Sequence, residues 1–409
     1  MDAPLPRRHA QSRGFTLIEL MVATFLSSAV LLSVYFVFIS NTKQYYVQEQ
    51  IVRMQESMRF GMEYLKNDVR NAGRLTVANG IDGSGALRQV GRDPQFCAVR
   101  SQIRGLQLFE DDRGSPDVLS RYGNGHRPDR LRLLTDASGA TPLLIARAQR
   151  DRLTLMRPLD QPSEMARDLL GSEGRFEQAF RPGFYLYVVT RSGDSDLLPI
   201  AETRFDINGS TIQFQDELCP RGAGTTIGDA CFAGECYAAP VQLVEYAVAT
   251  DRDDPEKTIL ERRVIDARNG TIPIPELTLV VAEYVIQLQV WGTFDTRDEL
   301  AVGAGPRPPG IVEDLDPTDD RGNWPGRDAE AEIVNERPER LRAVNILVAT
   351  RTPREDPDFK IAPDRDRNIG DRILHDLTWF ELDDTPNTGF ARVATLRSEV
   401  GTPNLFRGR

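Results

Sequence analysis

The chain has 409 residues, a formal net charge of −11 at pH 7 and an apolar content of 40%. That apolar content excludes a disordered chain and suffices for one large or two small folded domains. An acidic chain repels nucleic-acid phosphates, so the composition argues against a nucleic-acid partner.

The most apolar segment is residues 15–39, and no charged residue occurs between residues 20 and 42. As a helix at ~1.5 Å per residue this segment would be ~37 Å long, whereas the hydrocarbon core of a bilayer is ~30 Å thick. It is too long for the apolar region of a secretory signal, and no small-residue cleavage site follows it. Arg7, Arg8 and Arg13 precede it, which predicts a cytoplasmic N-terminus and an exported body.

Glu19 lies one helical turn inside this apolar segment. A charged side chain within a membrane-spanning helix costs about 2.5–3.5 kcal/mol on insertion scales, so a compensating interaction is expected. One interpretation is that Glu19 reaches the membrane surface, helped by the positive end of its helix. The other is that the chain is cut after Gly14, so that Glu19 of a neighbouring helix neutralises the new amino group of Phe15 and sets the helix register.

Residues 13–19, Arg-Gly-Phe-Thr-Leu-Ile-Glu, closely resemble the class III signal of the type IV pilin superfamily. In that family a short basic leader ends in glycine and is followed by Phe-Thr-Leu-Ile-Glu. The resemblance implies that prepilin peptidase cuts between Gly14 and Phe15 and methylates the amino group of Phe15. It also implies that Glu19 is the glutamate used in assembly.

Residues 51–72 carry a single apolar stripe at helical spacing, with charged residues between its members. Its three methionines are expected to be core residues and not a cofactor site. Gly73 is expected to end the helix, with Arg70 in the last turn. The resemblance implies a leader at 1–14, and the apolar patterns predict a helix over 15–73 that is transmembrane over 15–39. The stripe consists of Ile51, Met54, Met58, Met62, Leu65, Val69 and Ala72.

After residue 73 the hydrophobic period becomes alternating, which is typical of strands. Loops and not helices separate the expected strands, which favours an antiparallel sheet. The predicted fold class is therefore α+β, a long N-terminal helix packed on a β-rich head at 74–409. In one strand, Tyr284, Ile286, Leu288 and Val290 are expected to share a face. Strands are expected at residues 153–156, 184–190, 241–249, 259–265, 284–290, 344–348 and 392–396.

Several segments resemble the PilW-like minor pilins in particular, namely residues 44–49, 58–60, 65, 68–73, 244–246, 260–263, 285–290, 292, 295, 342–348 and 392–397. The resemblance implies a minor pilin that initiates pilus assembly at or near the tip, first in the inner membrane and then in the pilus at the cell surface. Implied partners are other minor pilins, the major pilin, a PilY-type tip adhesin and the assembly platform. A J-type minor pseudopilin of type II secretion, or a single-pass anchored periplasmic domain, remains the alternative.

The sequence contains none of the common catalytic motifs, and its three histidines are scattered. We therefore expect no enzymatic activity and no cofactor.

Four cysteines are present, and in an exported protein an even number favours disulfides. They allow three pairings, between which the sequence does not choose. The short turn-forming insert between Cys231 and Cys236 favours that pair, together with Cys97–Cys219. A zinc site is the alternative, although the spacings contain no C-x₂-C pair.

Residues 295–340 are rich in proline, glycine and acidic residues and are expected to form an acidic loop inserted into the head. Asp314, Asp316 and Asp320 have the alternate spacing of oxygen ligands for Ca²⁺. Pro317 and the proline at position 325 break the EF-hand pattern. A solvated acidic loop is therefore preferred to a calcium site.

Overall fold

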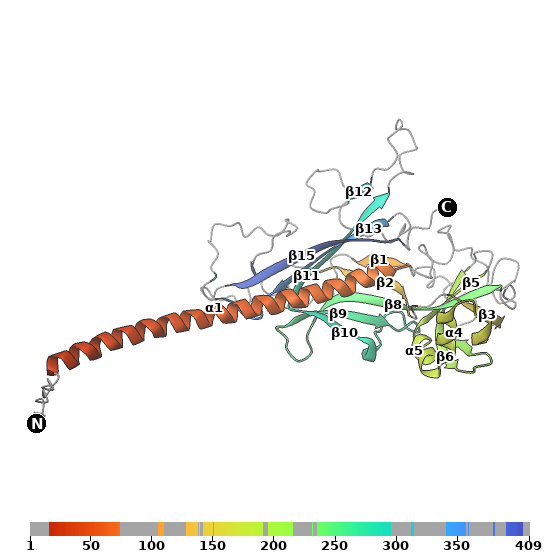
Figure 1. Ribbon diagram of the computed structural model, residues 1–409. Coiled ribbons are helices and arrows are strands. Elements are labelled where there is room, and N and C mark those ends of the chain that lie inside the picture. Colours follow the sequence, from red (N-terminus) through yellow and green to blue (C-terminus); the bar gives the residue numbers. More distant parts are fainter. Residues whose placement is uncertain are drawn as a thin grey trace, which may run out of the picture. The chain divides into compact units, whose positions relative to one another are not determined.

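A computed structural model describes residues 16–73, 105–109, 128–137, 139, 142–149, 151–190, 195–215, 231, 235–295, 312–314, 341–356, 359, 379–380 and 390–403 (Figure 1). Two compact units divide the chain between Arg53 and Met54. Each unit is described by itself below.

The helix α1, Leu17–Asn71, confirms the long helix that the sequence predicts. It contains no proline and one glycine, so nothing in its interior interrupts the backbone hydrogen bonds. Gly73 follows its end with φ 73° and donates its N–H to the carbonyl of Leu134 at 3.0 Å. That conformation is the left-handed one in which glycine terminates helices.

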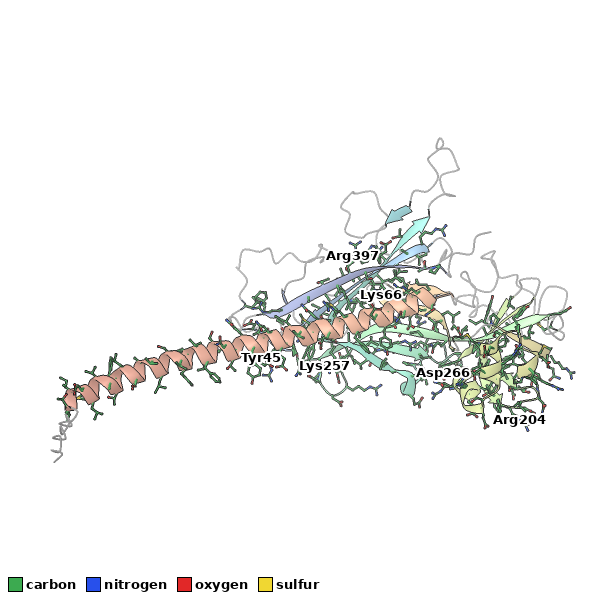
Figure 2. The ribbon with its side chains drawn as sticks, viewed as in Figure 1. Tyr45, Lys66, Arg204, Lys257, Asp266 and Arg397 are labelled. Atoms are coloured by element: carbon green, nitrogen blue, oxygen red, sulfur yellow. A yellow bond between two sulfur atoms is a disulfide. The ribbon has the colours of Figure 1, made fainter. Side chains whose placement is uncertain are left out.

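Within the second unit, the stripe of α1 is buried as predicted, from Met54 through Met58, Met62, Leu65 and Val69, with Ala72 just after the helix. The solvent-facing side is polar and carries the ion pair of Lys66 with Glu63 at 3.2 Å (Figure 2). The amphipathic pattern thus positions one face of the helix on the core.

Ten strands form the first sheet, and all their pairings are antiparallel, which confirms the predicted sheet type. The order β1-β2-β8-β3-β4-β7-β6-β5 closes on itself because β5 also pairs with β8, and β9 and β10 extend the sheet from β8. The bounds are β1 Leu106–Phe109, β2 Arg130–Asp136, β3 Leu143–Ala148, β4 Arg152–Leu155, β5 Tyr185–Thr190, β6 Ser195–Arg204, β7 Thr211–Phe214, β8 Cys236–Thr250, β9 Thr258–Ile265 and β10 Leu279–Glu283.

Among the described residues, two short helices lie between strands, and the sequence interpretation did not foresee them. They are α4, Glu164–Leu170, and α5, Glu173–Ala179. Ser163 caps α4 by accepting the N–H of Ala166 at 3.1 Å, and both helices bury apolar side chains in the core. The part of the chain that the structure describes also contains two single-turn 3₁₀ helices, η1 at Pro158–Asp160 and η3 at Pro275–Leu277.

The second sheet has the order β12-β11-β13-β15-β14. Its strands are β11 Val285–Asp295, β12 Val312–Asp314, β13 Leu341–Arg351, β14 Trp379–Phe380 and β15 Ala391–Gly401. Two expectations are corrected here. Tyr284 lies outside β11, with φ 54°, and a register shift between Val285 and Gln287 interrupts the expected alternation. The segment expected to be only a loop contributes β12, which pairs with β11.

The second half of α1 covers the outer edge of β10. Ser57 accepts the backbone N–H of Glu283 at 2.8 Å. A Cβ on Gly61 would lie 3.1 Å from the carbonyl oxygen of Val281 and 3.0 Å from Cβ of Ala282. Gly61 therefore allows the helix backbone to approach the strand closely, and the helix protects an edge that would otherwise be open.

We expect Gly61→Ala to lower the free energy of unfolding by up to about 2 kcal/mol, because overpacking of about 1–3 kcal/mol outweighs the gain in helix propensity of about 1 kcal/mol. Gly174→Ala in α5 is the matched control. Nothing lies within 4 Å of its added Cβ, so it should raise that free energy by about 0.5–1 kcal/mol. Denaturant unfolding of the full chain in detergent measures both, and equal signs would contradict the close contact.

Candidate functional site

The start of α1 is closed by a reciprocal cap between Thr16 and Glu19. Oε2 of Glu19 accepts the backbone N–H of Thr16 and its hydroxyl, both at 2.9 Å. The hydroxyl oxygen of Thr16 accepts the backbone N–H of Glu19 at 3.3 Å. This is the capping-box arrangement of Thr-x-x-Glu, whose spacing is visible in the sequence although the sequence interpretation assigned Glu19 no such role.

The cap gives the Glu19 carboxylate hydrogen-bond partners within the apolar segment. One oxygen atom of its carboxylate already accepts hydrogen bonds from two donors of its own chain. Within the described part of the chain, Oε1 has no hydrogen-bond partner. A further cation can therefore be accommodated at Glu19 without breaking the cap.

Within the first unit, the apolar side chains of α1 are exposed all round the helix. By length and composition α1 can cross a membrane, and it is the only described helix that meets this test. Such a surface is unfavourable in water, so lipid or other helices are expected to cover it. The exposed side chains are Leu17, Ile18, Leu20, Met21, Val22, Phe25, Leu26, Val30, Leu31, Leu32, Val34, Tyr35, Phe36, Val37 and Phe38.

In the second unit, a polar cluster attaches the end of α1 to the first sheet. Oδ2 of Asp68 on α1 accepts the hydroxyl of Tyr246 on β8 at 2.6 Å and Nε of Arg262 on β9 at 2.7 Å. Tyr246 is fully buried, and the side chains of Asp68 and Arg262 are each 16% exposed. We call these three residues the Asp68 cluster. The sequence interpretation missed this cluster, because Asp68 is 178 positions from Tyr246 and 194 positions from Arg262, and no local motif spans such separations.

The electrostatics of the Asp68 cluster keep the side chains of Tyr246 and Arg262 in one protonation state each. Burial, and then the negative charge of Asp68, raise the pKa of Tyr246 far above its ordinary value. For Arg262, burial acts to lower the pKa, but the Asp68 carboxylate raises it overall. The phenol therefore stays a donor and the guanidinium stays charged, which suits a fixed attachment of the helix.

The structure describes two of the four cysteines. Cys231 and Cys236 form a disulfide with their Cα atoms 5.3 Å apart, which is the pairing that the sequence favours. Cys97 and Cys219 lie outside the described residues, and their pairing stays a prediction.

The remaining predicted site residues are mostly outside the described part of the chain. This holds for Gly14 and Phe15 at the expected cut, and for Asp316 and Asp320. Asp314 lies in β12, opposite Thr293 of β11. Among the residues that the structure describes, no group of three or more His, Cys, Asp or Glu side chains could hold a metal ion.

Residues 9–35 match the family described as "Prokaryotic N-terminal methylation motif". No curated protein matches the chain. Among solved structures, a type IV-like pilin from Thermus thermophilus is 14% identical, with 60% of this chain and 98% of that chain covered and a TM-score of 0.18. That score is too low to establish a common fold. The methylation motif and the apolar helix α1 that begins within it support a protein that is anchored in a membrane by its N-terminal segment.

Tyr246→Phe tests the Asp68 cluster. We expect it to lower the free energy of unfolding at pH 7 by about 1.5–3 kcal/mol, because a hydrogen bond to a charged group is lost. The raised pKa of Tyr246 gives stability that is present below the ordinary value near 10 and is lost as pH rises above it, when the unfolded phenol ionises.

The difference between wild type and Tyr246→Phe should therefore narrow between pH 9 and pH 11, values on either side of the ordinary pKa of 10.0. Denaturant unfolding at several pH values measures this difference. Tyr237→Phe, which changes an exposed tyrosine of the same strand, is the control and should match wild type at pH 7. A difference that grows with pH would contradict the assignment.

Proposed function

We propose that this chain is a minor pilin of a type IV pilus. It would be cut by prepilin peptidase between Gly14 and Phe15 and incorporated through α1 to initiate assembly at or near the tip. The observation that carries the proposal is the methylation motif at residues 9–35, within which a helix begins whose apolar side chains are exposed on every side. The proposed role is structural, with no catalytic step and no cofactor.

The Thr16–Glu19 cap supplies a physical route to assembly. Removal of the leader leaves a cationic amino group on Phe15. In a bundle of such helices this amine is surrounded by apolar side chains and needs a negative partner. Oε1 of Glu19 from a neighbouring subunit can accept it while Oε2 keeps the helix capped. The pair fixes the axial stagger of the two helices.

In this proposal, the Asp68 cluster gives the head a fixed place on the helix that carries it. The partners would be other minor pilins, the major pilin, a PilY-type tip adhesin and the assembly platform. The contacts would be heterologous, because a filament needs an interface that does not close on itself. The chain would lie in the inner membrane with its head outside the cytoplasm before it enters the pilus.

Processing is tested by Gly14→Leu. We expect the variant to keep residues 1–14 and to remain in the membrane, because a bulky side chain replaces the glycine at the cut. Intact-mass measurement of wild type and variant reports both the cut and the methyl group on Phe15. If the protein were instead an anchored periplasmic domain that is never cut, wild type and variant would both have the mass of the full-length precursor.

Assembly is tested by Glu19→Gln, which separates charge from capping. Glutamine serves at the third position of a capping box, so the helix start should be retained. The charge that would pair with the Phe15 amine is lost, so we expect the protein to be cut normally but to be depleted from sheared pili at least about tenfold, the effect of about 1.4 kcal/mol.

Glu49→Gln is the matched control, because it removes a carboxylate of the same helix that pairs with Arg53 at 2.6 Å outside the apolar segment. It should leave the amount in pili unchanged. Wild-type abundance of Glu19→Gln in the fibre fraction would refute the charge pairing. Wild-type protein that is cut but found only in type II secretion fibres would refute the pilus assignment.

A further inference from the structure

The chain carries the pattern Asn-x-Ser/Thr, with a middle residue other than proline, at two positions. They are Asn208-Gly209-Ser210 and Asn269-Gly270-Thr271. In an exported protein this pattern marks an asparagine that accepts a glycan, and such asparagines lie in surface loops. Because so short a pattern also occurs by chance, the surroundings of each asparagine decide whether it is a site.

The second segment lies at the tip of the loop that follows β9. The bridge between Ile265 and Pro273 closes the base of this loop. At its tip, Asn269 and Gly270 donate their backbone N–H groups to the carbonyl of Asp266, at 3.1 and 2.8 Å, and Gly270 has φ 70°. The segment is therefore a tight turn on a fixed base, and Figure 2 labels Asp266 at that base.

The groups that define the pattern are accessible at this tip. Asn269 and Thr271 are both exposed. Within the described part of the chain, neither the side-chain amide of Asn269 nor the hydroxyl of Thr271 has a hydrogen-bond partner. A Cβ added to Gly270 would have nothing within 4 Å, so the backbone between them also borders open space. An enzyme that recognises the pattern can reach each of its three residues.

The first segment differs in the residue that completes the pattern. It forms the turn between β6 and β7, and although Asn208 is exposed, Ser210 is only 3% exposed. The Ser210 hydroxyl accepts the N–H of Asp206 and donates to the carbonyl of the same residue, both at 3.2 Å. In the folded head this hydroxyl is buried and occupied, so the structure separates two segments that the pattern alone treats as equal.

We propose that Asn269 is an N-glycosylation site of the exported head. The donor is an oligosaccharide joined through its anomeric carbon to a membrane-bound polyprenyl diphosphate. The amide nitrogen of Asn269 forms a bond to the anomeric carbon, and the bond from that carbon to the diphosphate oxygen breaks. The polyprenyl diphosphate leaves, and the proton lost by the amide goes to a base of the transferase. Only the location of the head outside the cytoplasm rests on the proposed function.

The fold tolerates a glycan at this position. The neighbouring Arg268 is held at the base of the loop, where its Nη2 donates to Oδ2 of Asp266 at 2.6 Å. Because the Asn269 side chain makes no hydrogen bond to the described chain, its modification would break no such contact of the head. The glycan would lie beside Ile272, which is 58% exposed, and would shield that apolar side chain from water.

Intact-mass measurement of the full-length protein, purified from the membranes of its own organism, tests the site. We expect a mass that exceeds that of the polypeptide by a whole number of sugar residues. Asn269→Gln should return the protein to the polypeptide mass. Thr271→Ala should lower the glycosylated fraction at least about tenfold, whereas Thr271→Ser, which keeps the hydroxyl, should retain the glycan.

Asn208→Gln is the matched control, because it removes the asparagine of the pattern whose hydroxyl is buried, and it should leave the added mass unchanged. Chemical denaturation should give Asn269→Gln the unfolding midpoint of Asn208→Gln, which separates loss of the glycan from loss of the fold.

Three results would overturn the inference. They are a wild-type mass equal to that of the polypeptide, a glycan that survives Asn269→Gln, and a glycan that is lost in Asn208→Gln. Removal of the leader is read from the peptide that begins at Phe15, and the glycan from the peptide that contains Asn269. This inference and the proposed function can therefore fail independently.

Discussion

The structure of the second unit depends on the contact between the buried stripe of α1 and both sheets. Met58, Met62, Leu65 and Val69 belong to one continuous core with side chains from the first sheet and from the second. A helical stripe specifies a face but leaves the rotation and height of the helix loosely defined, because apolar contacts have little direction. The hydroxyl of Ser57 and the Asp68 cluster are directional, and they fix the helix at two heights on the sheet.

The two parts of α1 solve different problems with the same secondary structure. From Met54 onward, burial of one face stabilises the helix, and the opposite face is polar and carries an ion pair. Before Arg53 no side of the helix is buried, and the capping box is the polar device that closes its start. The carboxylate of Glu19 therefore has a use within its own chain as well as the proposed use between chains, and Glu19→Gln separates the two because capping needs an acceptor and pairing needs a charge.

Local patterns predicted those parts of the fold whose determinants are local. The long helix, its end at Gly73, the antiparallel strands around β8, β9 and β13, and the Cys231–Cys236 disulfide could be predicted from spacing and turn signals. The helices α4 and α5 are seven residues each, too short for a 3.6-residue period to be visible. The Asp68 cluster could not be predicted, because its three members are brought together only by the docking of α1.

The Thr16–Glu19 cap is intermediate between the features that local patterns predicted and the Asp68 cluster, which they could not predict. The Thr-x-x-Glu spacing is a local signal, but the two interpretations of Glu19 drawn from the sequence concerned the membrane surface and assembly, and neither was a cap. The roles of Gly14, Phe15 and Glu19 in processing and assembly remain predictions from sequence. Their chemistry involves a leader cut and a second chain.

Tyr284 marks the point at which the chain passes from the first sheet to the second. The helix α1 contacts the end of β10 at Ser57 and Gly61. The chain leaves the first sheet directly after β10, at Tyr284, where φ is 54°. A left-handed conformation of a bulky residue costs about 1–3 kcal/mol.

Contacts on both the side chain and the backbone of Tyr284 offset that cost. Its ring has the guanidinium of Arg351 at 5.2 Å and the ammonium of Lys257 at 5.8 Å, and its carbonyl accepts the N–H of Arg351 at 2.9 Å. Alternation alone places Tyr284 on the face of β11, since the pattern continues without a break. The turn lies beside the contact of α1 with β10, and a contact between elements so far apart in sequence is not visible in the local pattern.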